Sequence, residues 1–155
     1  MNKNKIIWGI ILTAVIIVIV WIDLPYIFSS ENLISKNNYS CTYVEANVIN
    51  FETGKNTKVE NKAGNVDKIV EALDNLKVKK TRMPKEINRY FVTFTEAEKK
   101  TESETKTDTV FTVYFYDDGV IGFQDKLNQR IKYYKIKKDP KEVENLIEEL
   151  SGMES

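Results

Sequence analysis

The chain has 155 residues with 23 basic and 23 acidic side chains, no histidine and one cysteine. A net charge of zero gives no field that attracts nucleic acid, so we expect no nucleic-acid partner. The absence of histidine removes the commonest general base and the commonest transition-metal ligand, and a single cysteine cannot form an internal disulfide. The composition therefore argues against most catalytic and metal-binding classes, and the length suits one small domain after an N-terminal segment.

The N-terminal segment is an uninterrupted apolar run over residues 6–22, preceded by Lys3 and Lys5 and followed by Asp23. Each Ile, Val or Leu favours insertion of a spanning helix by about 0.3–0.6 kcal/mol, so a dozen contribute about 4–7 kcal/mol. A helix that is apolar all round needs lipid or a large core around it. We expect residues 1–28 to form a cytoplasmic tip and a transmembrane signal anchor whose bilayer-embedded side chains include Ile6, Trp8, Ile11, Val15, Val18, Trp21 and Ile22.

The flanking charges predict the direction of the anchor. Lysines before a first apolar segment stay in the cytoplasm, so we expect a single-pass cell-membrane protein with its N-terminus inside, its C-terminal domain outside and the lipid bilayer as a partner. A cleaved signal peptide needs small residues just before the cleavage site, and Ile27-Phe28-Ser29-Ser30 has no such pattern. A lipoprotein signal is not expected either, because Cys41 lies far beyond the apolar run.

Residues 29–40 are mostly polar, interrupted only by Leu33, Ile34 and Tyr39, and we expect a stalk there. The extracytoplasmic domain then covers residues 41–155. Cys41 opens a stretch typical of a strand, and two interpretations of it are open. It is either a buried small apolar residue or a partner in an intermolecular disulfide.

The first part of the domain predicts a hairpin and a helix. Residues 42–51 are rich in β-branched and aromatic side chains, and a turn at 52–55 leads to a second short strand at 57–59. Asn65 is expected to cap a helix, whose apolar side chains recur at helical spacing and form one buried face: Val66, Ile69, Val70, Leu73 and Leu76.

A basic segment without acids follows the helix, and Pro84 ends regular structure within it. In one interpretation it contacts an anionic surface, since each cation near a charged membrane contributes about 1 kcal/mol. In the other it is a solvated connector whose first lysines favour the helix C-terminus. The cations are Lys77, Lys79, Lys80, Arg82 and Lys85.

The second part of the domain predicts four strands and a helix. Residues 89–95 and 109–116 are expected to pair, with a mobile hairpin tip of mixed charge between them. Asp118-Gly119 indicates a tight turn into a strand at 120–123. The last strand, 130–137, predicts a bulge near Tyr133-Tyr134 because its apolar side chains change face there.

A final helix is expected to begin at Asp139-Pro140, where a capping carboxylate precedes proline. The predicted fold class is α+β, with a mainly antiparallel sheet of about six strands, two amphipathic helices on one face and a single transmembrane helix before it. The other sheet face is either open to a partner or occupied by cross-strand packing, and carries some of Tyr90, Phe91, Tyr114, Tyr116 and Tyr133.

The carboxylates predict no metal or catalytic centre. A calcium loop needs acids at alternate positions and a closing Glu, whereas only Asp125 follows Asp117 and Asp118. These three acids could form an acid/base pair, but nothing in the sequence places them in a pocket. No phosphate-binding loop or nucleophile elbow is present, so no catalytic residue and no cofactor is predicted, and an enzyme is the weakest hypothesis.

Four stretches together carry a resemblance: Phe51-Glu52-Thr53-Gly54-Lys55, the capped helix ending Leu73-Asp74-Asn75-Leu76-Lys77-Val78-Lys79-Lys80-Thr81, the aromatic strands around Asp118-Gly119, and Tyr133-Tyr134-Lys135-Ile136 before an acidic helix. Over residues 41–150 the chain resembles the small extracytoplasmic domains of uncharacterised lipoproteins and membrane-anchored proteins of Gram-positive bacteria. The resemblance implies no activity and no site residue.

The favoured hypothesis is a membrane protein that displays a binding or accessory domain, acting on a membrane or cell-envelope protein through its sheet face or its basic segment. The alternative is an immunity or stress factor that intercepts a membrane-active peptide or antibiotic.

Overall fold

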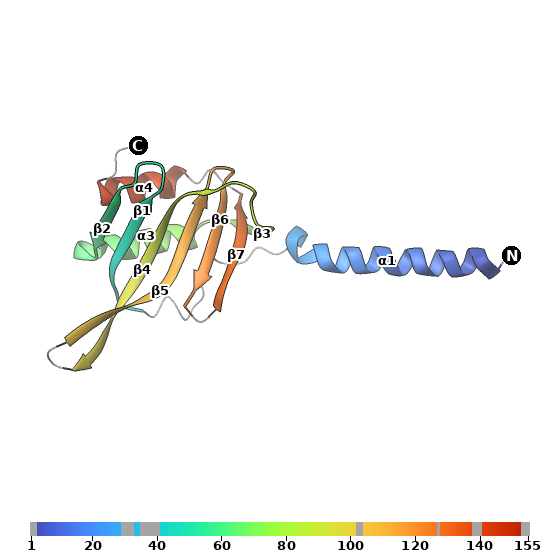
Figure 1. Ribbon diagram of the computed structural model, residues 1–155, viewed down its shortest axis with the longest axis horizontal. Helices are drawn as coiled ribbons and strands as arrows, with labels where there is room; N and C mark the ends of the chain where they lie inside the picture. Colours follow the sequence, from blue (N-terminus) through green and yellow to red (C-terminus); the bar gives the residue numbers. More distant parts are fainter. Residues whose placement is uncertain are drawn as a thin grey trace.

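The computed structural model describes residues 3–28, 33–34, 41–101, 104–126, 128–137 and 141–152, and joins a long N-terminal helix to an α+β domain (Figure 1). The domain contains a seven-stranded antiparallel sheet in the order β2-β1-β4-β5-β6-β7-β3. The elements are α1 Lys3–Phe28, β1 Tyr43–Asn50, β2 Asn56–Glu60, η1 Lys62–Gly64, α3 Asn65–Asp74, β3 Val78–Thr81, β4 Asn88–Thr101, β5 Glu104–Tyr116, β6 Val120–Asp125, β7 Asn128–Ile136 and α4 Lys141–Ser151.

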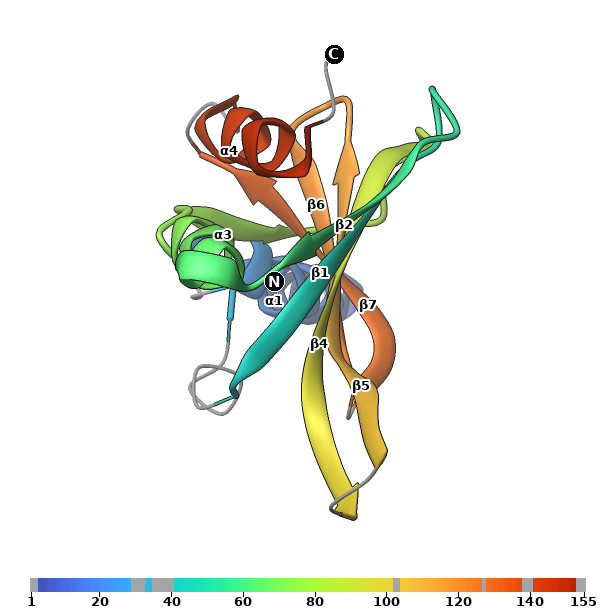
Figure 2. The same ribbon diagram turned by 90° about the vertical axis from the view of Figure 1, so that its left-hand side faces the viewer.

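The α+β class is confirmed, and both amphipathic helices lie on one face of the sheet (Figure 2). Strands β4 to β7 form a meander, which short turns between consecutive strands produce. Chain order and sheet order differ at two places: β1, rather than β2, pairs with β4, and β3, which follows α3, pairs with β7 at the far edge.

The core lies between that face and the helices. Alternate side chains of β4 and β5 point inward, and two aromatic pairs across these strands stack with ring centroids 4.5 Å apart: Tyr90 on Phe115, and Phe94 on Phe111. Full burial of such a side chain contributes about 1.5–3 kcal/mol. The helices add their apolar stripes to this layer: Val66, Ile69, Val70 and Leu73 from α3, Val143 and Ile147 from α4.

Two residues of the expected stalk belong to this core. Leu33 is 3% exposed and Ile34 is 2% exposed, and both are part of the buried cluster. The stalk prediction is therefore wrong for these two residues, because burial of their apolar side chains lowers the free energy of the folded chain. The other residues of 29–40 lie outside the described part of the chain. Only four residues, 29–32, separate the end of α1 at Phe28 from the buried Leu33.

Helix α1 extends away from the domain (Figure 1), and every side chain described along it, over residues 7–21, is exposed. Trp8 and Trp21 near the ends are 71% and 79% exposed. Across the part of the chain that the structure describes, no helix has both the length and the apolar character that crossing a membrane requires. The span expected over residues 6–22 stays a prediction.

The strand predictions need three corrections. The long loop expected at this hairpin tip is wrong over the residues described, because β4 and β5 continue their pairing to Thr101 and Glu104. The basic connector is instead an edge strand, β3, held to the core by Val78, which is fully buried. The bulge at Tyr133-Tyr134 is wrong: β7 pairs without interruption there, and the strand simply carries apolar side chains on both faces.

The expected cap of α3 is also corrected. Asn65 is the first residue of the helix, and the side chain of Asn61 takes the capping role. Its Oδ1 accepts hydrogen bonds from the backbone N–H groups of Val66 (2.9 Å) and Asp67 (3.4 Å). Its Nδ2 donates to the carbonyl oxygen of Tyr43 (2.9 Å), so one amide joins β1 to α3. The start predicted for the last helix at Asp139-Pro140 lies outside the described residues.

We predict that Asn61→Ala lowers the free energy of unfolding by about 1–2 kcal/mol, because two helix N–H groups and a strand carbonyl lose their partner. Asn65→Ala is the matched control and should change it by less than about 0.5 kcal/mol. Urea unfolding of the full chain in detergent measures both. Equal effects of the two substitutions would show that Asn61 is not the cap.

Candidate functional site

The outer face of the sheet carries a row of aromatic side chains, which we call the aromatic surface: Phe51, Phe91, Tyr114, Tyr116 and Tyr133. The rings form two groups of contacts across the strands, Phe51–Phe91–Tyr114 and Tyr116–Tyr133. Phe51 and Phe91 have centroids 5.4 Å apart, Phe91 and Tyr114 5.7 Å, and Tyr116 and Tyr133 6.1 Å. Four of the five aromatics expected on this face are therefore there; Tyr90 is the exception, since it stacks in the core.

Neither α3 nor α4 covers the aromatic surface, since both pack on the opposite face (Figure 2). Tyr114 is fixed by its hydroxyl, which donates to Oε1 of Gln124 at 2.7 Å. Gly122 leaves room beside it: a Cβ there would lie 2.9 Å from Cγ2 of Ile131 and 3.3 Å from Cβ of Tyr114. The aromatic surface thus ranges from Tyr116, which is 9% exposed, to Phe51, which is 53% exposed. Aromatic side chains of this kind are enriched at interfaces between proteins.

Burial perturbs the tyrosines of this row. Removal of the Tyr116 ring from water, with a smaller contribution from neighbouring Tyr133, raises the pKa of Tyr116 to about 12. Burial also raises the pKa of Tyr114. Both hydroxyls are therefore neutral at physiological pH and act as hydrogen-bonding groups rather than as proton-transfer groups.

A second candidate surface lies at the β3 edge of the sheet. The segment 77–85 contains five cations, and strand β7 with the residue after it, Lys137, contains four more; neither contains a carboxylate, and they lie side by side because β3 pairs with β7. Lys79 lies directly opposite Lys135, whose ammonium donates to the backbone oxygen of Asp118. We call this set the basic edge: Lys77, Lys79, Lys80, Arg82 and Lys85, together with Arg130, Lys132, Lys135 and Lys137.

The first five residues of the basic edge are those expected from the sequence, and the other four, at positions 130, 132, 135 and 137, were missed. Like charges directly opposite each other destabilise a sheet, so the pairing of Lys79 with Lys135 costs free energy that a bound anion can offset. Residues 130–137 form a run with four cations and no acid, which could have indicated a basic surface. That these cations lie beside those of 77–85 follows only from the pairing of β3 with β7.

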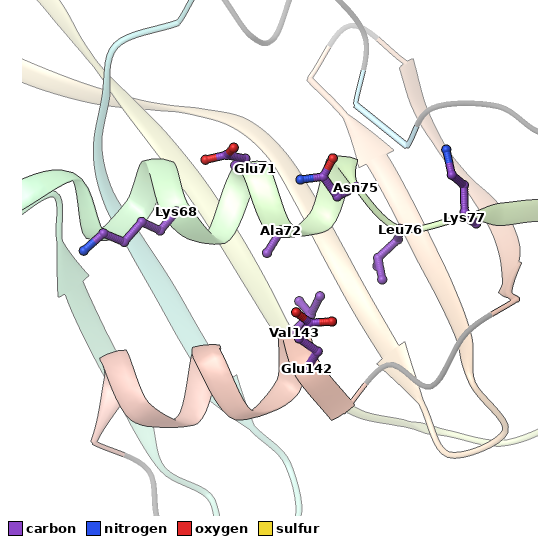
Figure 3. Close-up of a pocket in the computed structure, with 8 residues that line it drawn as sticks. All are labelled: Lys68, Glu71, Ala72, Asn75, Leu76, Lys77, Glu142 and Val143. Atoms are coloured by element: carbon purple, nitrogen blue, oxygen red, sulfur yellow. The ribbon is translucent and has the colours of Figure 1, made fainter.

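A groove of about 380 Å³ lies between α3 and the start of α4 (Figure 3). Its apolar side chains Ala72 and Leu76 point toward Val143 of the facing helix, whereas Lys68 and Glu71 point elsewhere. Because the charged groups do not converge on one point, the groove has the character of a helix-packing contact.

The three acids considered as an acid/base pair are not brought together. Asp117 pairs with Arg89 at 3.0 Å, and Asp118 accepts the backbone N–H of Val120 at 3.2 Å in the turn before β6. Asp125 lies at the other end of β6. Among the described residues, no three His, Cys, Asp or Glu side chains gather as a metal site.

Arg89 has a structural arrangement of its own, which sequence reasoning missed. Its guanidinium lies 3.0 Å from Asp117, 3.5 Å from Glu52 and 3.9 Å from Glu144, so it links two turns of the sheet to α4.

Cys41 is partly buried against the core. Burial, reinforced by the Glu96 carboxylate, raises the pKa of its thiol and disfavours the reactive thiolate.

We predict that the protein loses stability between pH 10 and about 12, partly through Tyr116. In this window the unfolded chain releases the phenolic proton and the native state keeps it, so the unfolded state binds fewer protons and the free energy of unfolding falls as pH rises. Tyr116→Phe should make the fall less steep. Thermal unfolding of both chains in detergent over this range measures it, and identical slopes would contradict the prediction.

Comparison of the chain with protein-family models, curated proteins and solved structures finds no match. The resemblance to small extracytoplasmic domains of Gram-positive bacteria stays a prediction.

Proposed function

We propose that the protein is a membrane-anchored binding or accessory module: α1 holds the chain in the lipid bilayer, and the α+β domain is displayed at its outer surface. The observation that carries the proposal is the exposure of every described side chain of α1, residues 7–21.

Water is an unfavourable environment for this helix. Its large apolar side chains, from Ile7 to Trp21, are at least 46% exposed, and they surround the axis rather than forming one stripe. Soluble monomers rarely expose apolar patches of more than a few hundred Å². Lipid removes this penalty, and the two tryptophans near the helix ends suit the headgroup regions.

The charges beside the helix support the orientation. Lys3 and Lys5 precede the apolar run and Asp23 follows it. Because lysine is retained on the cytoplasmic side, the domain after α1 is exposed on the outside of the cell membrane.

The binding role draws its support from the aromatic surface. Phe51 is 53% exposed at the end of that surface, and its ring continues the row through Phe91. Aromatic side chains are enriched among the residues that dominate binding energy. A protein of the membrane or cell envelope is the partner class that such a displayed surface can meet.

We predict that the wild-type chain stays with membranes after alkaline carbonate washing, and that a C-terminal tag is digested by protease added to intact protoplasts. Ala14→Lys with Val15→Lys should release the chain into the wash, because each lysine near the helix centre costs about 2.5–3.5 kcal/mol. Ala14→Leu with Val15→Leu is the matched control and should stay membrane-bound. Extraction of the wild type by carbonate, or a protected tag, would contradict the anchor or its direction.

We also predict that chemical cross-linking in membranes, followed by mild extraction, recovers a partner whose yield falls about threefold or more in Phe51→Ser, as expected for a hot-spot aromatic. Met83→Ser is the matched control, because it removes an apolar side chain that is more exposed than Phe51 (71% against 53%) and lies outside the aromatic surface. A chain recovered alone, or equal yields from the two variants, would argue against binding through the aromatic surface.

A further inference from the structure

We infer that the basic edge, with the loop at 82–87, binds the headgroups of anionic lipids in the leaflet from which α1 emerges. This inference rests on the proposed membrane anchor and adds a second contact between the domain and the bilayer.

The basic edge lies beside the helix that we propose to be the membrane anchor. Helix α1 and strand β3 are neighbours, and β3 is the edge strand on the side of the sheet where α1 leaves the domain (Figure 1). Four residues join Phe28 to the buried Leu33. Five peptide steps span at most about 17 Å, so the domain cannot move far from the membrane surface, and the edge beside α1 is the part that faces it.

The basic edge is also a local concentration of positive charge. The basic edge holds nine cations without a carboxylate, in a chain whose charges cancel. The acids nearest to it are Glu86 in the adjoining loop, Asp118 beside Lys135 and Glu142, which lines a groove with Lys77. The helix that carries four glutamates, α4, contacts β2 at the opposite edge of the sheet from β3. A juxtamembrane cation contributes about 1 kcal/mol near an anionic leaflet, so this separation of charge orients the domain with β3 toward the lipid.

The loop after β3 also exposes apolar side chains. Met83 is 71% exposed and lies between Arg82 and Lys85, and Ile87 is 84% exposed and follows Glu86. Apolar side chains between cations are the composition that enters the headgroup region, where the cations meet phosphates and the apolar groups reach the acyl boundary.

The ligand chemistry is therefore a lipid phosphate in a surface, recognised by several cations at once rather than by one enclosed pocket. Lys79 and Lys135 lie opposite each other on β3 and β7, and a phosphate between them reduces the repulsion between their charges. Such binding is salt-sensitive, because it depends on exposed charges.

The test uses the full chain in vesicles of phosphatidylcholine alone or with phosphatidylglycerol. Met83→Cys in a Cys41→Ser background carries a fluorescent label, and quenching by spin-labelled lipid reports contact of the loop with the bilayer. We expect quenching about threefold or more stronger with phosphatidylglycerol at low salt, and loss of that difference at high salt. Lys79→Gln, Lys80→Gln and Lys135→Gln together should abolish it.

The matched control removes three exposed cations outside the basic edge: Lys55→Gln, Lys62→Gln and Lys68→Gln. It should quench as the unsubstituted chain does. A second measurement needs no substitution: trypsin cleavage after Arg82 in the wild type should be slower in phosphatidylglycerol vesicles, since lipid covers an exposed loop.

Flotation of the vesicles separates the two proposals. A chain that floats with both lipid mixtures but shows equal quenching and equal cleavage in them retains its anchor and overturns the lipid contact of the basic edge. A triple glutamine variant that behaves as the control does overturns it as well. A chain that floats with neither mixture overturns the anchor, and the inference with it.

Discussion

The burial of Leu33 and Ile34 is the constraint on which the arrangement of this protein depends. These two side chains enter the same core that the sheet and both helices form, so the segment after α1 is fixed to the domain almost at once. A polar stalk would let the domain rotate freely above a membrane. A tether of four residues instead gives one edge of the sheet a defined neighbour, and β3 occupies that edge.

The charges of the chain are unevenly distributed over the sheet, although their sum is zero. The chain is neutral overall, yet its cations gather along β3 and β7 and the glutamates of α4 lie toward β2. The sheet thus has one basic end next to α1 and one acidic helix at the other. The aromatic surface runs across the face between these ends, on the side that no described helix covers. One face and one edge are therefore available for two different contacts.

Local patterns were sufficient to predict the strands and helices that bury one side. The alternation in β4 and β5 and the helical spacing of Val66, Ile69 and Leu73 report directly on the core they form. Features that depend on distant partners were predicted wrongly. Val78-Lys79-Lys80-Thr81 has little strand character alone and forms a strand because β7 offers an unpaired edge.

The same reasoning explains the other errors. Asn61 caps α3 across a short 3₁₀ turn, so its role depends on a loop conformation that includes the left-handed Gly64. Tyr133 and Tyr134 looked like a change of register because both faces of β7 are apolar, which happens when one face meets the core and the other meets the aromatic surface. The residues of the two candidate surfaces could not be grouped from the sequence for the same reason. Strand order decides which side chains are neighbours on a sheet, and no single segment predicts strand order.

The β4–β5 hairpin has a consequence for how far the protein reaches. Strand β1 follows β4 only to Glu96, and β6 begins to pair with β5 at Phe111, so the outer part of the hairpin is a two-stranded ribbon without neighbours. An isolated ribbon of this kind has little stability of its own. Five further residues of β4, at about 3.3 Å each, project it roughly 17 Å past the sheet. The domain thus combines the basic edge beside α1 with a two-stranded arm on the side away from α1 (Figure 1), and this arm opens at a lower free energy than the body of the sheet.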